Sequence, residues 1–287
     1  MSKEVSVNLF DVEWSEDRFQ QLSVTLDEYA ALPLNERWRD DIRLERVELH
    51  QSQGQNVYLL DFSKRRDVGP GRLGHVAPIA AIRLAQDEDF GEETAAMYVP
   101  ARRWLLVLHN QSGVGPSRMM SYFNALDPGV ANRHFDYAAR PRLDPGAQQR
   151  FGGMRAISTV SVTATLDALA AAQAGTGTSL AEATRSVGAK RVKVELLANE
   201  AYGRGDRLAN GPTRNFIRGL LRQDPAEVTH LEVKGEVDGR DQLIDLIEHK
   251  VRRKYSANEL VVVHHRYTLE SRWNLLLRTH RHWLANL

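Results

Sequence analysis

The sequence predicts an α+β fold with two domains, each built from a mostly antiparallel sheet flanked by helices. Short segments in which apolar and polar residues alternate, as in half-buried strands, recur along the whole chain. Segments with apolar residues at helical spacing lie between them. The chain has 287 residues, of which 42% are hydrophobic, so it can bury substantial cores.

In the first half, the segment that begins at Glu4 carries apolar residues at alternate positions and predicts a strand. Ser15 precedes two acidic residues and predicts a helix N-cap. Gly54 lies between two apolar runs and predicts a hairpin turn. The predicted elements are strands at Glu4–Val12, Leu44–Gln51, Asn56–Phe62, Thr94–Val99 and Trp104–His109, helices at Ser15–Leu32 and Ser117–Leu126, and an extended segment at Phe135–Leu143.

In the second half, strands and helices alternate. Asp144 before Pro145 predicts the start of a short helical turn, and Ser179 with Glu182 has the capping-box pattern of a helix start. The predicted strands are Ala156–Ala164, Val192–Leu196, His230–Val237 and Glu259–His265, and the predicted helices are Thr165–Ala174, Ser179–Val187, Thr213–Leu221, Leu243–Val251 and Thr268–Leu284. The stretch Asp144–Gly153 predicts the domain boundary, which gives an acidic region of residues 1–148 and a basic region of residues 149–287.

The formal net charge of +1 conceals an asymmetric distribution. Residues 1–100 contain 11 basic and 19 acidic residues, a net charge of −8, whereas residues 101–287 contain 27 basic and 18 acidic residues, a net charge of +9. The basic part is suited to an anionic polymer such as nucleic acid. The alternative is that the two parts neutralise each other within the protein.

Several classes of protein are excluded or disfavoured. No apolar run reaches the ~18 residues of a transmembrane helix, so no membrane insertion is expected. The absence of cysteine excludes disulfides, thiolate zinc sites and cysteine nucleophiles. The first residues lack the apolar core of a signal peptide, which predicts a cytoplasmic location. The basic segment Ser63–Gly74 is predicted to be a loop, and a phosphate or strand contact is the alternative, although its glycines do not match the spacing of a phosphate-binding loop. No cofactor is expected.

The strongest local signal is a row of arginines on the predicted helix Thr213–Leu221. Arg214, Arg218 and Arg222 are four residues apart and lie along one stripe of an α-helix. Such a stripe repels itself unless negative groups lie opposite, and guanidinium groups pair well with phosphate oxygens. The residues expected to contact nucleic acid are Lys190, Arg191, Lys193, Arg204, Arg207, Arg214, Arg218 and Arg222, with a second patch of Arg252, Arg253 and Lys254. Double-stranded DNA is the expected partner; a solvated basic face is the alternative.

Aromatic and histidine side chains near these charges fit structural roles better than base stacking or metal binding. The spacing of Tyr255, Tyr267, Trp273 and Trp283 fits packing in a core better than stacking on bases. Neighbouring histidines on a strand point to opposite faces, and no HExxH motif exists. No metal site is therefore expected at His249, His264, His265, His280 and His282.

Two other functions remain open. Glu232 and Lys234 alternate on a predicted strand, as in metal-dependent nucleases, although the same pattern arises on any exposed sheet face and the required aspartate is not identified. The serine-hydrolase motif GxSxG is absent, and no catalytic residue is assigned. In the third hypothesis, the chain is a non-catalytic subunit of a complex that binds a protein partner through its acidic N-terminal region.

A particular order of elements runs through the second half: the strand Arg191–Leu197, a basic loop, the helix Thr213–Leu221, the strand His230–Gly235 followed by Asp238-Gly239-Arg240, and a closing helix with Trp273 and Trp283. This order, with the Gly-Pro turn and helix at Gly113–Leu126, resembles RexA-like phage-exclusion and anti-phage defence proteins. The resemblance covers about residues 90–287. It implies a cytoplasmic homodimer that binds DNA and acts in anti-phage defence, without an established catalytic motif.

Overall fold

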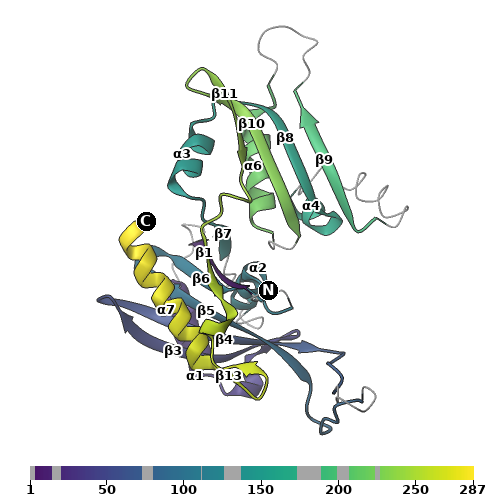
Figure 1. Ribbon diagram of the computed structural model, residues 1–287, viewed down its shortest axis with the longest axis vertical. Coiled ribbons are helices and arrows are strands. Elements are labelled where there is room, and N and C mark those ends of the chain that lie inside the picture. Colours follow the sequence, from purple (N-terminus) through teal and green to yellow (C-terminus); the bar gives the residue numbers. More distant parts are fainter. Residues whose placement is uncertain are drawn as a thin grey trace. The chain divides into compact units, whose positions relative to one another are not determined.

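The computed structural model describes residues 4–14, 21–72, 80–110, 112–125, 137–172, 189–198, 207–223 and 227–287. These residues form helices and largely antiparallel sheets, which confirms the predicted α+β class (Figure 1). The chain divides into two compact units. The first unit comprises residues 1–7, 14–137 and 253–286, and the second unit comprises residues 8–13, 138–252 and 287.

The first unit is built on a large sheet with the strand order β12-β1-β6-β5-β4-β3-β2, and strand β1 continues into the second unit, where it pairs with β7. The strands are β1 (Glu4–Glu13), β2 (Trp38–Arg39), β3 (Ile42–Ser52), β4 (Gln55–Arg66), β5 (Phe90–Val99), β6 (Trp104–Leu108) and β12 (Arg252–Ser256). The helices are α1 (Leu22–Ala31), α2 (Pro116–Asn124) and α7 (Leu269–Asn286), with short 3-10 helices η1 (Leu34–Arg37), η2 (Pro100–Arg102) and η4 (Ala257–Glu259). A separate hairpin consists of β13 (Val262–Val263) and β14 (Arg266–Tyr267).

The hairpin predicted around Gly54 is confirmed. Strands β3 and β4 pair up to Ser52 and Gln55, and the two residues between them, Gln53 and Gly54, have φ angles of 53° and 73°. Two left-handed residues match the twist of antiparallel strands, and glycine adopts this conformation without steric cost. Strand β4 extends to Arg66 and pairs with β5 from Tyr58 to Arg66. The prediction that Ser63–Gly74 is a loop is therefore wrong for its first residues.

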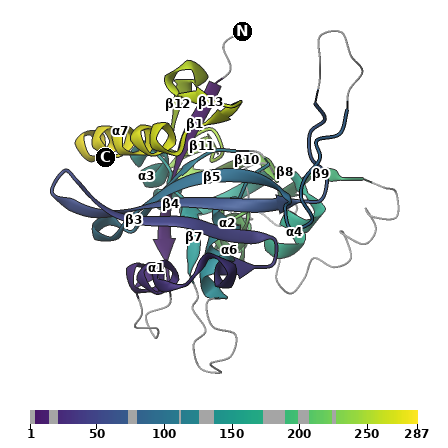
Figure 2. The same cartoon turned by 90° about the horizontal axis from the view of Figure 1, so that it is seen from below.

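Strand β4 is buried on both faces. All residues from Val57 to Phe62 are buried, and successive side chains of a strand point to opposite faces, so both faces of the sheet need a cover. Figure 2 shows this cover, with α1 on one side of the sheet and α7 on the other. On the α1 side, Phe62 packs edge-on against Tyr122 of α2, with ring centroids 5.6 Å apart, and Tyr122 stacks on Tyr29 of α1 at 4.7 Å.

Asp61 is the charged residue in this buried run, and it pairs with Arg272 of α7. The guanidinium donates from Nη1 to Oδ1 at 2.6 Å and from Nη2 to Oδ2 at 3.4 Å, and the two side chains are only 8% and 6% exposed. Nη2 of Arg272 also lies 3.6 Å from Glu93 of β5. Burial raises the pKa of Asp61 to about 6 even though Arg272 lowers it. Next to this pair, Trp273 Nε1 donates to the Leu60 carbonyl at 3.1 Å, so two adjacent residues anchor α7 to β4.

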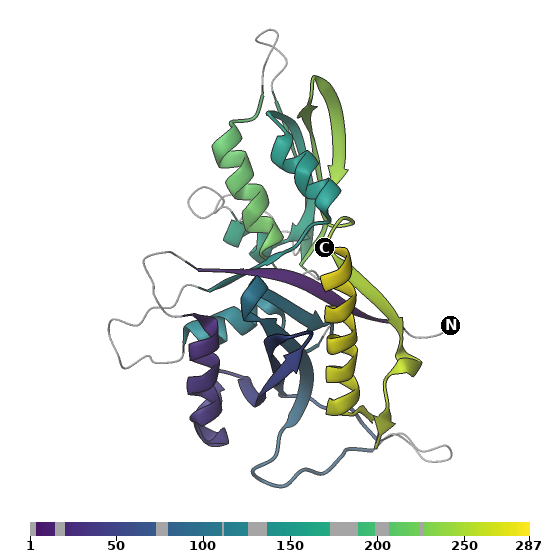
Figure 3. The ribbon, with the colours of Figure 1, turned by 90° about the vertical axis from the view of Figure 1, so that its left-hand side faces the viewer.

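The second unit contains a four-stranded antiparallel sheet with the order β11-β10-β8-β9. Its elements are β7 (Ala138–Pro141), α3 (Pro145–Gly153), β8 (Ala156–Thr165), α4 (Leu166–Ala172), β9 (Arg191–Leu197), α6 (Asn210–Leu221), β10 (Val228–Val237) and β11 (Arg240–Asp245). Figure 3 shows α3 and α6 beside these strands.

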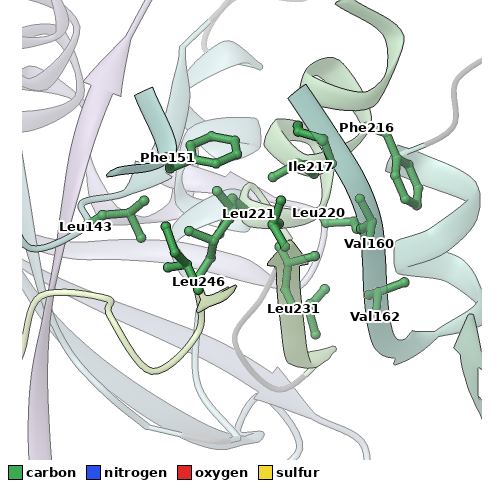
Figure 4. Packing of buried hydrophobic residues seen from close by; sticks show 14 of the residues in the cluster. Leu143, Phe151, Val160, Val162, Phe216, Ile217, Leu220, Leu221, Leu231 and Leu246 are labelled. Carbon is green, nitrogen blue, oxygen red and sulfur yellow. The ribbon is translucent and has the colours of Figure 1, made fainter. Parts of the chain in front are cut away.

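One hydrophobic core joins the sheet of the second unit to its helices (Figure 4). Ile217 and Leu220 of α6 pack with Val160 of β8 and Leu231 of β10 in this cluster. Helix α6 also comes close to α4 at Gly219, where an added Cβ would lie 3.0 Å from the backbone of Ala172. The helices therefore cover one face of the sheet, and the alternate strand residues point away from it.

The two units differ from the predicted domains of residues 1–148 and 149–287. Residues 253–286 belong to the first unit, because α7 packs on β5 and β6 and pairs with Asp61 of β4. The linear charge pattern does not reveal this return of the chain. Of the four aromatic residues predicted to pack in a core, Tyr255, Trp273 and Trp283 are buried, whereas Tyr267 of β14 is only half-buried.

Two further predicted elements are wrong. The predicted helix Leu243–Val251 instead contains the end of strand β11, because Asp238 and Gly239, with φ angles of 51° and 77°, close a tight β10–β11 hairpin. The predicted strand Glu259–His265 contains only the two-residue strand β13. The predicted helix Ser179–Val187 and the predicted helix start at Ser15 lie outside the described residues.

Among the described residues, no helix combines the length and apolarity needed to span a membrane.

Removing one partner of the Asp61–Arg272 pair should destabilise the fold strongly. In Asp61→Leu, the buried guanidinium of Arg272 loses both of the oxygen acceptors that Asp61 supplies, and the free energy of unfolding should fall by about 3 kcal/mol or more, measured by urea denaturation. The double variant Asp61→Leu, Arg272→Met removes both charges and should recover most of this loss. A double variant that is less stable than Asp61→Leu would contradict this role of the pair.

The raised pKa of Asp61 predicts a pH dependence with a defined sign. The carboxyl titrates near 3.8 in the unfolded chain and near 6 in the folded protein, so the folded state binds the proton more tightly. The contribution to stability is fully present below the unfolded pKa and is lost as the pH rises through 6. From pH 7 to pH 5, the wild type should gain on the order of 1 kcal/mol relative to Asp61→Asn. A difference that stays constant with pH would argue against the raised pKa.

Candidate nucleic-acid interface

The predicted phosphate-binding residues do not form one continuous surface. Lys190, Arg191 and Lys193 lie at the start of β9, Arg214 and Arg218 lie on α6, and Arg222 directly follows that helix. The second predicted patch lies on β12. Arg204 falls outside the described residues.

Arg214 has a structural role rather than a free guanidinium group. Its Nη1 donates to the Phe151 carbonyl at 3.1 Å, its Nη2 donates to the Met154 carbonyl, and its Nε donates to Asn210 at 2.7 Å. The guanidinium carbon also lies 5.1 Å from the centre of the Phe151 ring. These contacts join α6 to carbonyl groups at the end of α3 that the helix itself leaves without partners. The guanidinium of Arg214 is therefore occupied by contacts within the second unit, and its contact with phosphate stays a prediction.

Other predicted residues already have acidic partners. Arg207 pairs with Glu236 at 2.8 Å in the second unit, and Lys254 pairs with Glu4 at 3.0 Å in the first unit. Arg222 Nη2 lies 3.6 Å from Glu13. Exposed pairs of this kind contribute at most ~1 kcal/mol, so a phosphate could compete for these side chains. They are partly neutralised, as the alternative of internal pairing between the acidic and basic regions predicts.

Exposed cations remain at the start of β9. Val192 and Val194 pack against the core of the second unit, so Arg191 and Lys193 point to the face of the sheet that the helices leave open. Lys190 and Lys193 are exposed, and neither forms an ion pair with an acidic residue in the part of the chain that the structure describes. Strand β9 is also the last strand of its sheet, and no described strand pairs with its outer edge.

The exposed cations of α6 lie on the other side of the same sheet. Arg218 is exposed and forms no ion pair with the acidic residues that are described, but its helix packs on the face opposite to Lys193. Arg252 is similarly exposed, whereas Arg253 is half-buried against the ring of Tyr255 at 5.4 Å. A single stretch of duplex therefore cannot lie flat on the β9 and α6 cations together.

The strand register reveals neighbours that the sequence alone does not identify. Thr163 of β8 lies directly beside Lys193 on the open face, and Ser161 lies beside Glu195. Threonine hydroxyls are common partners of phosphate oxygens. These residues were missed because the pairing of β8 with β9 spans a long stretch of sequence and no local motif encodes it.

The register also supplies an aspartate for the predicted nuclease motif. Asp245 of β11 lies opposite Glu232, and His230 is within 3.4 Å of Glu232 and 3.0 Å of Asp245. Lys234 pairs with Asp241 at 3.4 Å. No group of three histidine, aspartate or glutamate side chains among the described residues is arranged to hold a metal ion. The geometry thus gives a charged row on a sheet face and not a metal centre.

Histidines of the second half take part in helix capping and in a tight turn. His249 Nδ1 bonds to Asp144 at 2.6 Å, and the same carboxylate caps α3 by accepting from Ala147 N at 2.8 Å, as predicted for this helix start. Burial would raise the pKa of Asp144, but the hydrogen bonds from Ala147 and His249 outweigh burial and lower it. His264 and His265 form the turn between β13 and β14 with positive φ angles.

The contacts of Arg214 predict that it matters for stability and not for ligand binding. Arg214→Ala should lower the free energy of unfolding by about 1–3 kcal/mol, because the carbonyls of Phe151 and Met154 lose their donors. Arg218→Ala, on the same helix but exposed, should change it by less than ~0.5 kcal/mol. Urea denaturation of both variants measures the contrast, and equal effects would refute the structural role.

Comparison with known proteins places the chain in a family without assigning it a function. A search among curated proteins found no match to it. A family model described as "Family of unknown function (DUF6731)" matches residues 3–277, which covers elements of both units. The chain therefore belongs to this family of unknown function, DUF6731.

Proposed function

We propose that this protein binds the backbone of double-stranded DNA through the cations at the start of β9. The observation that carries the proposal is the exposure of Lys190 and Lys193 beside an open sheet face, where neither pairs with a described acidic residue. Arg191 lies between them in sequence on the same face as Lys193. Neutralising phosphates with such side chains releases counterions from DNA, which supplies sequence-independent affinity.

Neighbouring groups complement these cations. Thr163 is half-buried beside Lys193 and offers a hydroxyl donor, and the outer edge of β9 offers backbone N–H groups. Further along the same face, Glu195, Glu232 and Asp245 are acidic and would repel phosphates. This arrangement confines the contact to one end of β9 and favours a short footprint with few phosphate contacts.

The wider biological role rests on the resemblance to RexA-like proteins. In this proposal the protein is a cytoplasmic homodimer that acts in anti-phage defence. A homodimer would present two β9 surfaces to one duplex. Because the second surface binds as part of the same molecule, the dimer would bind DNA much more tightly than a single protomer with its few phosphate contacts. The acidic first region is the surface proposed for a protein partner.

DNA binding is favoured over the nuclease alternative because Lys190 and Lys193 form no ion pair with a described acidic residue, whereas the charged groups of the nuclease motif are paired with one another. Lys234 pairs with Asp241, and both ring nitrogens of His230 face carboxylates. Lys190 and Lys193 need no rearrangement to meet a phosphate. The other alternative, a non-catalytic subunit that binds only a protein partner, requires that the purified protein carries no nucleic acid.

Removing the two lysines should weaken DNA binding. In the variant Lys190→Ala, Lys193→Ala, affinity for a duplex of mixed sequence should fall by about tenfold, and the dependence of log affinity on log salt should become shallower by about 2, because two phosphate contacts are lost. A mobility shift at several salt concentrations measures both quantities.

The matched control removes the same charge from the first unit. Arg46 and Arg83 are exposed there, and the variant Arg46→Ala, Arg83→Ala should bind DNA as the wild type does. Equal losses in the two double variants would show that only total charge matters, and unchanged binding in the lysine variant would remove β9 from the interface.

A further inference from the structure

A cavity of about 400 Å³ lies in the first unit, between the end of the β3–β4 hairpin and one face of helix α7. The hairpin contributes residues His50 to Gln53. The helix contributes Ser271, Asn274, Arg278 and Arg281, whose spacing places them along one stripe. The volume falls within the range of small-molecule sites. None of the residues proposed to bind DNA lines this cavity.

The lining of the cavity carries a positive charge. The acidic residue Glu259 also lines the cavity, where it pairs with Arg278. Glu259 accepts a hydrogen bond from Ser256 N at 3.0 Å and so is held in the capping box of η4. Arg278 also lies over the ring of Tyr255 at 4.8 Å, which fixes its position. Arg281 is exposed at the cavity and forms no ion pair with a described acidic residue. One guanidinium thus remains uncompensated, and His50 adds a ring nitrogen.

A buried polar pair borders the same cavity. Ser52 lines it with an exposed fraction of 6%, and the Oγ of Ser52 lies 3.0 Å from Nδ1 of His280, which is fully buried. Nε2 of His280 has no hydrogen-bond partner in the described structure. No second partner therefore fixes the tautomer of the ring, so the Ser52 hydroxyl can act as either donor or acceptor. Burial and the charge of Arg102 lower the pKa of His280, which keeps the ring neutral at pH 7.

We propose that this cavity binds a small organic phosphate, with Arg281, Arg278 and His50 around the phosphate and with Ser52, held by His280 behind it, bonded to the uncharged part of the molecule. A phosphate monoester has three terminal oxygens and accepts from several donors at once, whereas a carboxylate has two. Guanidinium groups match the geometry of phosphate oxygens. The adaptable hydroxyl of Ser52 suits a ligand with hydroxyl or amide groups.

The test measures the melting temperature of the full chain with inorganic phosphate, AMP or acetate as probes, each up to about 10 mM at constant ionic strength. Phosphate and AMP should raise it in the wild type, and AMP should act at lower concentration. Acetate should have little effect. In Arg281→Ala, the half-saturating AMP concentration should rise by about tenfold, because a charge-assisted hydrogen bond is lost. In Ser52→Ala, phosphate should act as before while the advantage of AMP disappears.

Two controls separate this site from general charge effects and from the DNA surface. Arg46→Ala removes a charge from strand β3 outside the cavity and should respond to AMP as the wild type does. Lys190→Ala, Lys193→Ala should also keep the full AMP response. The proposal is overturned if AMP fails to stabilise the wild type, if Arg281→Ala responds normally, or if acetate acts as strongly as phosphate.

Discussion

The buried ion pair between Asp61 and Arg272 is the interaction on which the organisation of the chain depends. A carboxylate in the middle of a strand that is buried on both faces requires a cation in the same place, and Arg272 of the last helix supplies it at 2.6 Å. Since a lone buried charge is far more costly than a paired one, α7 must pack on β4 for the buried Asp61 to have a partner. Residues 253–286 therefore complete the first unit, although about 115 residues of the second unit separate them from the rest of it.

This division of the chain also decides which charges remain available for ligands. Acidic residues from the first part of the sequence form ion pairs with basic residues from the rest, so part of the charge asymmetry is neutralised within the protein. Glu4 pairs with Lys254, Asp11 with Arg142 and Glu13 with Arg222. Lys193 remains exposed without such a described partner, and it lies on a sheet face that the helices of the second unit leave open. The function proposed for this surface is therefore limited to a small region, and the net charge of +1 is consistent with that limit.

The sequence predicts those features that depend on local spacing. Alternation identified β8, β9 and β10, and Asp144 identified the start of α3. Local spacing is insufficient where a long-range contact decides the outcome. Arg214 shares the spacing of Arg218, but its role depends on the end of α3, some 60 residues away in sequence. The apolar residues from Leu243 to Ile247 also fit a helix, and the Asp238-Gly239 turn makes the first of them part of a strand. The cavity at α7 combines residues 50–53 with residues 271–281 and has no local signature.

A salt titration of DNA binding by the wild-type protein tests the functional claim most directly. The β9 surface offers Lys190, Arg191 and Lys193 as phosphate contacts, and each contact contributes about −0.9 to the slope of log affinity against log salt concentration. We expect a slope near −3 for one protomer on mixed-sequence duplex, between about 50 and 200 mM salt. No detectable binding at the lowest salt, or an affinity that does not change with salt, would contradict the account.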